Sequence, residues 1–316
     1  MLRLALTTLG IALAACGSAG AMPVTEPSAG VCFGAAARDP RHDPCRHPKP
    51  TRAVYPVPRD AQIAPAAPCL PIGQADLVTD CAFGRLDATA TGTVALVGDS
   101  HAAAWRAALE VVAQAQGWRG LSITRDGCAL SLALRNTAEP ARSQCLTWSR
   151  EVVAWFKRHP EIATVFVSSL ATNKRVLVPP GGDRFAAEAR GYHRVWKALP
   201  RTVKHIVVLR DVPRVHDTTL ACVRRAMRRH GWPGPACSVS RRHGLVADAA
   251  AAAARAWPTR RVQLVNMTPF FCGRHRCLPV VGGALVYKDG HHLTTVFSTT
   301  LGPFVLRRVR ALAAAW

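Results

Sequence analysis

A short stretch in the first half of the chain, residues 94–101, constrains the fold more than any other feature. Its first four residues, 94–97, are apolar and rich in β-branched side chains, which predicts a buried strand. Gly98 ends this strand, and Asp99 is a residue type that caps the helix predicted by the alanine-rich segment after it. Ser100 is therefore expected on a tight turn from strand to helix, at the edge of an α/β sheet where ligands bind.

Strand and helix patterns alternate from residue 93 onwards. Such alternation predicts a parallel sheet whose strands are joined by right-handed helical crossovers. With Ser100 after the first of five strands, we expect the flavodoxin-like strand order, in three layers with helices on both faces. A hairpin is expected at Gly282 and Gly283. The strands are expected at residues 94–97, 121–124, 164–168, 205–209 and 263–266, and helices at 102–116, 148–157, 185–199, 248–257 and 294–315.

A second stretch near the end of the sequence, residues 287–294, supplies the residue types that a serine nucleophile needs. A general base must reach the hydroxyl, and a carboxylate must orient that base. Asp289 and His292 are three positions apart, so a short turn can bring carboxylate and imidazole together. Two alternatives stay open: His291 replaces His292 as the base, or the pair is a loop histidine beside a helix cap. The presence of both stretches in one chain favours catalysis.

Side chains near these stretches are expected in supporting roles. His101 follows Ser100 into the helix, where we expect it at the helix start or behind the site. Arg210, Asp211 and Arg214 follow the fourth predicted strand, and we expect them to pair with one another. A cluster of arginines is expected to form a solvated face: Arg224, Arg225, Arg228 and Arg229.

Together the two stretches resemble the SGNH (GDSL-type) hydrolase superfamily. The chain is most similar to the branch joined to membrane acyltransferases, which O-acetylate cell-envelope polysaccharides. The similarity rests on residues 96–102, on residues 287–294 and on the cysteine pair Cys272 and Cys277, and it covers roughly residues 69–316. It implies the three-layer, flavodoxin-like SGNH hydrolase fold, with about five parallel strands, helices on both faces and disulfide cross-links.

The resemblance also implies a mechanism. Ser100 is expected as the nucleophile, His292 as the base and Asp289 as the group that orients it. Family members stabilise the oxyanion with a glycine N–H and often an asparagine, for which Gly127 and Asn173 are the nearest candidates beside the N–H of Ser100. The implied function is an exported serine esterase or O-acyltransferase that acts on acyl groups, chiefly acetyl, of cell-envelope polysaccharide, without cofactor or metal. The alternative is a non-catalytic SGNH-fold module that binds glycan or a membrane acyltransferase.

The first residues have the pattern of an export signal. A basic residue precedes an apolar run, residues 4–15, that is too short to span a bilayer. The four residues ending at Cys16 resemble a lipobox, so Cys16 is expected to be lipidated; the alternative is ordinary signal cleavage near Ala21. We expect the protein in the cell envelope, lipid-anchored to the outer face of the cytoplasmic membrane or in the periplasm. The expected divisions are a signal peptide (1–21), a proline- and cysteine-rich arm (22–90) and an SGNH-like domain (91–316).

Cysteine usage is consistent with export. The chain has 11 cysteines, and without Cys16 an even number remains. They lie in near pairs along the sequence, which predicts five local disulfides in an oxidising compartment. The expected pairs are Cys32 with Cys45, Cys69 with Cys81, Cys128 with Cys145, Cys222 with Cys237, and Cys272 with Cys277. Zinc is the alternative, although neither candidate cluster has zinc-finger spacing. The clusters are His42, Cys45, His47 and Cys272, His275, Cys277.

The formal net charge is +22, from 41 basic and 19 acidic residues. Such a charge suits an anionic partner such as nucleic acid, acidic glycan or anionic lipid. The basic residues are overwhelmingly arginine, which points to a compositional bias, and no basic run is interleaved with aromatic residues. We therefore expect no nucleic-acid partner. The expected partners are acylated polysaccharide or another envelope glycan, a separate membrane acyltransferase, and the membrane itself through the lipid anchor.

Overall fold

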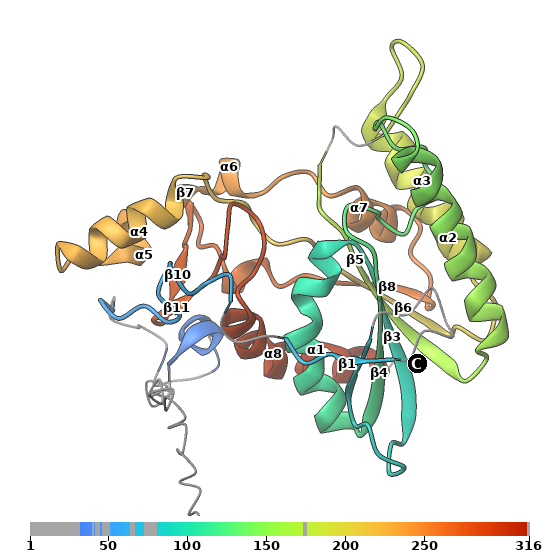
Figure 1. Ribbon diagram of the computed structural model, residues 1–316, viewed down its shortest axis with the longest axis horizontal. Helices are drawn as coiled ribbons and strands as arrows, with labels where there is room; N and C mark the ends of the chain where they lie inside the picture. Colours follow the sequence, from blue (N-terminus) through green and yellow to red (C-terminus); the bar gives the residue numbers. More distant parts are fainter. Residues whose placement is uncertain are drawn as a thin grey trace, which may run out of the picture.

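The structure is a computed structural model, and it describes residues 32–39, 41, 45, 51–63, 67–72, 81–172 and 176–314. The predicted export signal, the lipidation candidate Cys16 and the oxyanion candidate Asn173 lie outside the described residues. Within the described ranges, no helix is both long enough and apolar enough to cross a bilayer. Figure 1 shows a central sheet with helices on both sides and a smaller lobe of short elements next to it.

Seven strands form the central sheet, in the order β1-β2-β4-β3-β5-β6-β8. The strands from β4 to β8 run parallel, while β1 and β2 add an antiparallel edge. The parallel strands have the flavodoxin-like order, so the predicted fold class is confirmed. The antiparallel edge is new, because strands of two and four residues are too short to show a hydrophobic period. The strands are β1 (Leu70–Pro71), β2 (Cys81–Gly84), β3 (Gly92–Gly98), β4 (Trp118–Thr124), β5 (Ile162–Ser168), β6 (His205–Leu209) and β8 (Val262–Val265).

Alternation along β3 divides the apolar side chains between two cores. Val94 and Leu96 belong to the core that includes α1 and α8, whereas Ala95 and Val97 belong to the core that includes α2, α3 and α7. Successive strand residues point to opposite faces, so a continuous apolar run fills both cores. Helices therefore cover both faces, as predicted (Figure 1). The helices are α1 (Ser100–Gln116), α2 (Ala141–Arg158), α3 (Arg184–Ala198), α7 (Ala249–Ala256) and α8 (Thr295–Ala313).

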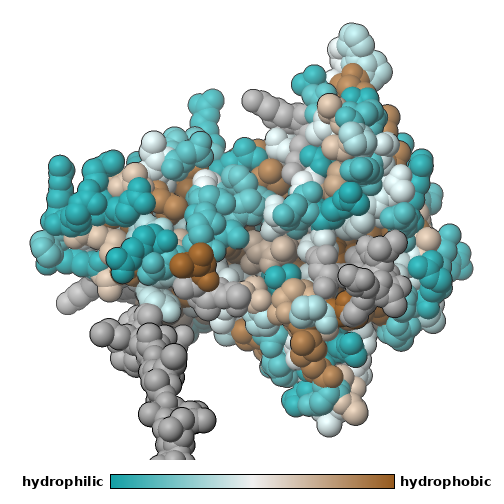
Figure 2. Space-filling model, in the orientation of Figure 1, coloured by the Kyte–Doolittle hydropathy of each residue, from teal (hydrophilic) through white to brown (hydrophobic). Residues whose placement is uncertain are grey.

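The smaller lobe contains the arginine cluster and the predicted hairpin. Val223 of α4 is fully buried, while the cluster arginines on that helix and after it are exposed. They form the outer side of an amphipathic helix, and Figure 2 shows a hydrophilic surface over α4. The hairpin turns at Gly282 and Gly283, where β10 pairs with β11. The short elements are η1 (Gly34–Arg38), α4 (Thr219–Arg228), α5 (Pro233–Ala236), β7 (Val239–Ser240), α6 (Arg241–Gly244), η3 (Thr268–Phe270), β9 (Arg276–Cys277), β10 (Val280–Val281) and β11 (Ala284–Leu285).

The described parts of the N-terminal arm lie against the domain. Asp39 forms an ion pair with Arg307 of α8, with Oδ2 and Nη2 2.9 Å apart. The Tyr55 N–H donates to the carbonyl of Gly283 at 2.8 Å, and the Tyr55 carbonyl accepts from the Leu285 N–H at 2.9 Å. These backbone bonds place the arm alongside the hairpin, so this part of the arm is an element of the folded structure.

Ten cysteines form five disulfides, with the pairing expected from their spacing. Sulfurs that are bonded to each other cannot supply the thiolates that zinc needs, so the alternative of zinc binding through Cys45, Cys272 and Cys277 is wrong. Each bridge closes a loop of fewer than twenty residues and stabilises its surroundings locally. The pairs are Cys32–Cys45, Cys69–Cys81, Cys128–Cys145, Cys222–Cys237 and Cys272–Cys277.

Candidate active site

Ser100 lies at the first turn of α1, directly after β3. Asp99 is fully buried and caps the helix: its carboxylate accepts from the His101 N–H at 2.9 Å and from the Leu170 N–H at 3.1 and 3.2 Å. Gly98 has a φ of +150°, and a Cβ there would collide with the Ser168 carbonyl oxygen. Glycine and aspartate are therefore needed to present Ser100 between β3 and β5, where the strand order reverses.

The second predicted stretch meets Ser100 across the sheet edge. His292 Nε2 lies 2.8 Å from Ser100 Oγ, and His292 Nδ1 lies 2.7 Å from Asp289 Oδ2. The other oxygen of Asp289, Oδ1, accepts from the backbone N–H groups of His291 and His292, at 2.8 and 2.7 Å. The turn is closed by a bond from the Lys288 N–H to the His292 carbonyl. This geometry allows proton transfer from the hydroxyl to an imidazole that a carboxylate orients.

Opposing effects act on the Asp289 carboxyl group. Burial raises the pKa of Asp289, but the hydrogen bonds from the His292 side chain and from the two backbone N–H groups outweigh it. The net pKa of Asp289 is well below its ordinary value, so the group is a carboxylate throughout the physiological range. A permanent anion at this position holds the proton of His292 on Nδ1, which leaves Nε2 free to accept from Ser100.

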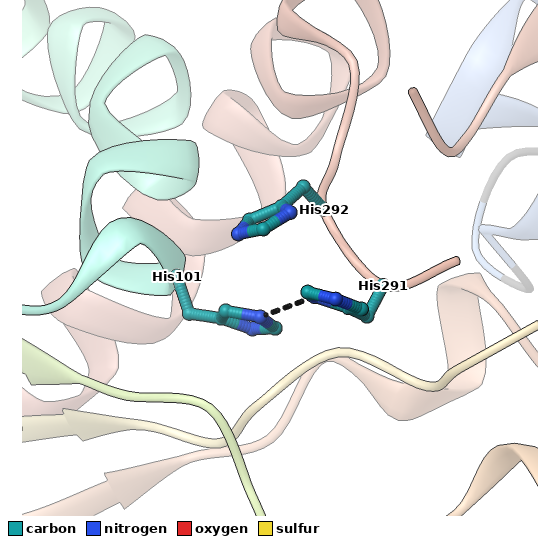
Figure 3. Close-up of side chains that lie close together, drawn as sticks. All are labelled: His101, His291 and His292. Carbon is teal, nitrogen blue, oxygen red and sulfur yellow. Dashed lines mark hydrogen bonds between the residues drawn. The ribbon is translucent and has the colours of Figure 1, made fainter. Parts of the chain in front are cut away.

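A second chain of hydrogen bonds runs beside the first. His101 Nδ1 lies 2.6 Å from Asp211 Oδ1, and His101 Nε2 lies 2.9 Å from His291 Nδ1. Asp211 and His101 are buried, and Asp211 also accepts from the backbone N–H groups of Ala171 and Val212. Figure 3 shows His101 reaching from α1 towards His291 on the loop, with His292 next to both. Burial lowers the pKa of His291, and the neighbouring histidines lower it further.

The role of Asp211 differs from the expectation. Asp211 does not pair with Arg210 or Arg214: its carboxylate bonds to His101, while the Arg214 guanidinium donates to the Ala171 carbonyl. The signal that points to Asp211 is its position, since it follows β6 at the same sheet edge as Ser100. His101 lies behind the site, as expected.

The structure describes two of the three candidates for stabilising the oxyanion. The Ser100 N–H lies at the start of α1, where the helix favours negative charge. Gly127 lies in the turn after β4, with a φ of +72°, and a Cβ there would face Arg135. Asn173 lies outside the described residues.

An open groove of about 570 Å³ lies away from these residues. The residues of the two hydrogen-bond chains described above, Ser100 included, do not line this groove. Because bonded geometry and not cavity size defines a reacting centre, we assign the candidate site to Ser100 and its partners. The groove is lined by Leu132, Ala133, Leu134, Leu146, Arg150, Val176, Leu177, Ala187 and Arg194.

Comparison with known proteins agrees with the fold. The periplasmic domain of a lipopolysaccharide acetyltransferase from Salmonella ser. Paratyphi A has a similar structure, with a TM-score of 0.54 and 14% sequence identity. The similarity covers 70% of this chain and 84% of the Salmonella chain. No curated protein sequence matches the chain. The family model described as the SGNH domain (fused to AT3 domains) matches residues 68–307. This protein therefore belongs to the SGNH domain family.

Proposed function

We propose that this protein is an exported serine esterase or O-acyltransferase that handles acyl groups, chiefly acetyl, on a cell-envelope polysaccharide. The unbroken hydrogen-bond chain from Ser100 through His292 to Asp289 is the observation that carries the proposal. Membership of the SGNH family supports an acyl-related reaction, and the Salmonella domain of similar fold is part of a lipopolysaccharide acetyltransferase. Five disulfides support an oxidising compartment outside the cytoplasm.

In the first half of the proposed reaction, Ser100 Oγ attacks the acyl carbonyl carbon while His292 Nε2 takes the hydroxyl proton. The Ser100 N–H at the start of α1 stabilises the oxyanion. When the tetrahedral intermediate collapses, His292 returns the proton to the leaving oxygen, and the acyl group stays on Ser100 as an ester. In the second half, His292 deprotonates water or a sugar hydroxyl, whose oxygen attacks this ester. When the bond to Ser100 breaks, His292 returns the proton to Ser100 Oγ. If water accepts the acyl group, the protein is an esterase, and if a sugar hydroxyl accepts it, the protein is an acyltransferase.

The proposal extends to partners and placement. Because the family is one of domains fused to AT3 domains, we propose a membrane acyltransferase as the source of the acyl group. The signal peptide over residues 1–21 and the lipidation of Cys16 stay predictions. An anchor there, followed by the arm, would hold the domain at the membrane surface.

Covalent labelling tests the nucleophile. Incubation of the folded protein with a fluorophosphonate probe is expected to modify Ser100, located by peptide mass spectrometry. Ser100→Ala is expected to abolish the label and to lower hydrolysis of p-nitrophenyl acetate by more than about 10⁴-fold. Ser143→Ala, which changes an exposed serine on α2, is the matched control and is expected to behave as wild type. Wild-type protein that takes up no label would instead favour the non-catalytic module.

A further inference from the structure

Three imidazole rings converge beside the reactive serine. One ring nitrogen from each of His101, His291 and His292 lies within 4.8 Å of the others. The closest pair, His101 Nε2 and His291 Nδ1, is 2.9 Å apart. The rings come from two distant parts of the chain, the start of α1 and the loop before α8, and Figure 3 shows them close to one another, with a hydrogen bond between His101 and His291. Zinc binds imidazole nitrogens at about 2.0–2.1 Å, so tetrahedral ligands are about 3.4 Å apart, and small ring rotations would reach that spacing.

Two of the three rings have the support that is typical of metal-binding histidines. Such histidines usually donate their other ring N–H to a carboxylate, which fixes the tautomer and makes the ligating nitrogen more basic. Here His101 bonds through Nδ1 to Asp211 at 2.6 Å, and His292 bonds through Nδ1 to Asp289 at 2.7 Å. In both rings, Nε2 is therefore the nitrogen that would bind a metal, in place of its present hydrogen bond to His291 or to Ser100.

The carboxylates themselves are firmly held. Asp211 accepts two further bonds from backbone N–H groups, and Asp289 accepts two as well. The carboxylates behind His101 and His292 place negative charge next to the rings, which favours a bound cation. The Arg214 guanidinium, which donates to the Ala171 carbonyl, opposes this charge in part.

We propose that His101, His291 and His292 form a Zn²⁺ site whose occupation switches off Ser100. Zinc would bind Nε2 of His101, Nδ1 of His291 and Nε2 of His292, with water or the Ser100 hydroxyl as the fourth ligand. The His291 proton moves from Nδ1 to Nε2, so three neutral rings bind the ion without net proton release. His292 Nε2 can then no longer accept the Ser100 proton. Three nitrogen ligands select Zn²⁺ over Mg²⁺ and Ca²⁺, which prefer oxygen.

The binding part of this proposal is independent of the proposed function; only the inhibition rests on it. Binding is measured by calorimetry with Zn²⁺ and by visible absorption with Co²⁺, whose tetrahedral nitrogen complexes absorb strongly. One ion per chain is expected for wild type and for Ser100→Ala. His291→Gln removes one ligand and is expected to weaken Zn²⁺ binding by more than the about 10- to 100-fold that loss of a supporting carboxylate costs. Melting curves check that this variant is folded.

A control separates this site from ordinary surface histidines. The His216 and His243 rings contact each other at a tilt of 36°, with centroids 3.9 Å apart, and His243 is exposed. His243→Gln is expected to bind Zn²⁺ as wild type does and to keep its sensitivity to Zn²⁺ in the esterase assay. EDTA is expected to restore activity to the inhibited wild type.

The outcomes are distinct. Wild-type protein that binds no Zn²⁺ at micromolar concentration, or a folded His291→Gln variant that binds it as tightly as wild type, would overturn the proposal. Normal Zn²⁺ and Co²⁺ binding by a protein that takes no fluorophosphonate label would uphold the metal site and count against the proposed enzyme. Active protein that binds Zn²⁺ at these histidines without losing activity would overturn the switch.

Discussion

Replacing Asp289 by asparagine should trap His292 in the wrong tautomer. Asp289 Oδ1 accepts two backbone N–H groups, and only Oδ2 faces the ring. An asparagine there must keep its oxygen towards the two N–H donors, because turning its NH₂ group towards them would leave both unsatisfied, at about 1–3 kcal/mol each. The NH₂ group therefore faces His292 Nδ1 and forces the ring proton onto Nε2, so the base presents a donor to Ser100.

The expected loss of reaction rate follows from this change of the His292 tautomer. For a serine triad, the wrong tautomer costs about 10⁴-fold in rate, which corresponds to about 5.4 kcal/mol of transition-state stabilisation. Turning the side-chain amide of the new asparagine over would lose two hydrogen bonds, at a cost of about 2–6 kcal/mol. This cost is large enough to keep the His292 ring in the inactive tautomer, with its proton on Nε2. The structure thus predicts that the carboxylate behind His292 accounts for most of the rate of the proposed reaction.

Steady-state hydrolysis of p-nitrophenyl acetate measures the effect as kcat/KM. Asp217→Asn is the matched control, because Asp217 is an exposed carboxylate on the loop after β6, next to Gly290, and the charge change is the same. The control is expected to keep wild-type activity. Urea unfolding should show Asp289→Asn to be more stable than Asp289→Ala, which loses the backbone acceptor as well. A folded Asp289→Asn variant that keeps more than about a tenth of kcat/KM would refute the tautomer reasoning, since the inactive form must dominate.

Three further predictions concern stability. Gly98→Ala places a methyl group against the Ser168 carbonyl at a positive φ, so the midpoint of urea unfolding should fall. Gly181 also has a positive φ but has open space around it, so Gly181→Ala should lower this midpoint much less. Replacing Cys222 and Cys237 together by serine should lower the free energy of unfolding by about 3 kcal/mol, measured against oxidised wild type; an unchanged value would mean the bridge adds nothing. Because the pKa of Asp289 is lower in the folded than in the unfolded chain, its contribution to stability is complete above about pH 4 and is lost as the pH falls further. Wild type should therefore lose more stability than Asp289→Asn between about pH 5 and pH 2.5 in urea titrations, and equal losses would contradict this.

Local chemistry made the strands and turns predictable. The predicted third and fourth parallel strands, 164–168 and 205–209, correspond closely to β5 and β6, because buried parallel strands are apolar along their whole length. Asp99 caps α1 and Thr294 caps α8, each by accepting from an N–H two or three residues later. Interactions this short are encoded in neighbouring residues, so a single sequence predicts them.

Contacts between distant segments needed the tertiary structure. Asp211 and His101 are 110 positions apart, and nothing near either residue shows that a buried carboxylate meets this imidazole. The pairing is decided by the positions of β3 and β6 in the sheet, since the ends of both strands open at the same edge. The same holds for the antiparallel edge of β1 and β2 and for the contact of Tyr55 with the hairpin.

Residues close together in the chain were enough to predict the order of the parallel strands and the helices between them, the turn that presents Ser100, and a short turn in which Asp289 can meet His292. The contact of His292 Nε2 with Ser100 across 192 positions, and the second carboxylate–histidine chain beside the first, depend on the folded arrangement. Dihedral preferences and helix caps act over a few residues, whereas these contacts form only when helices pack on the two faces of one sheet.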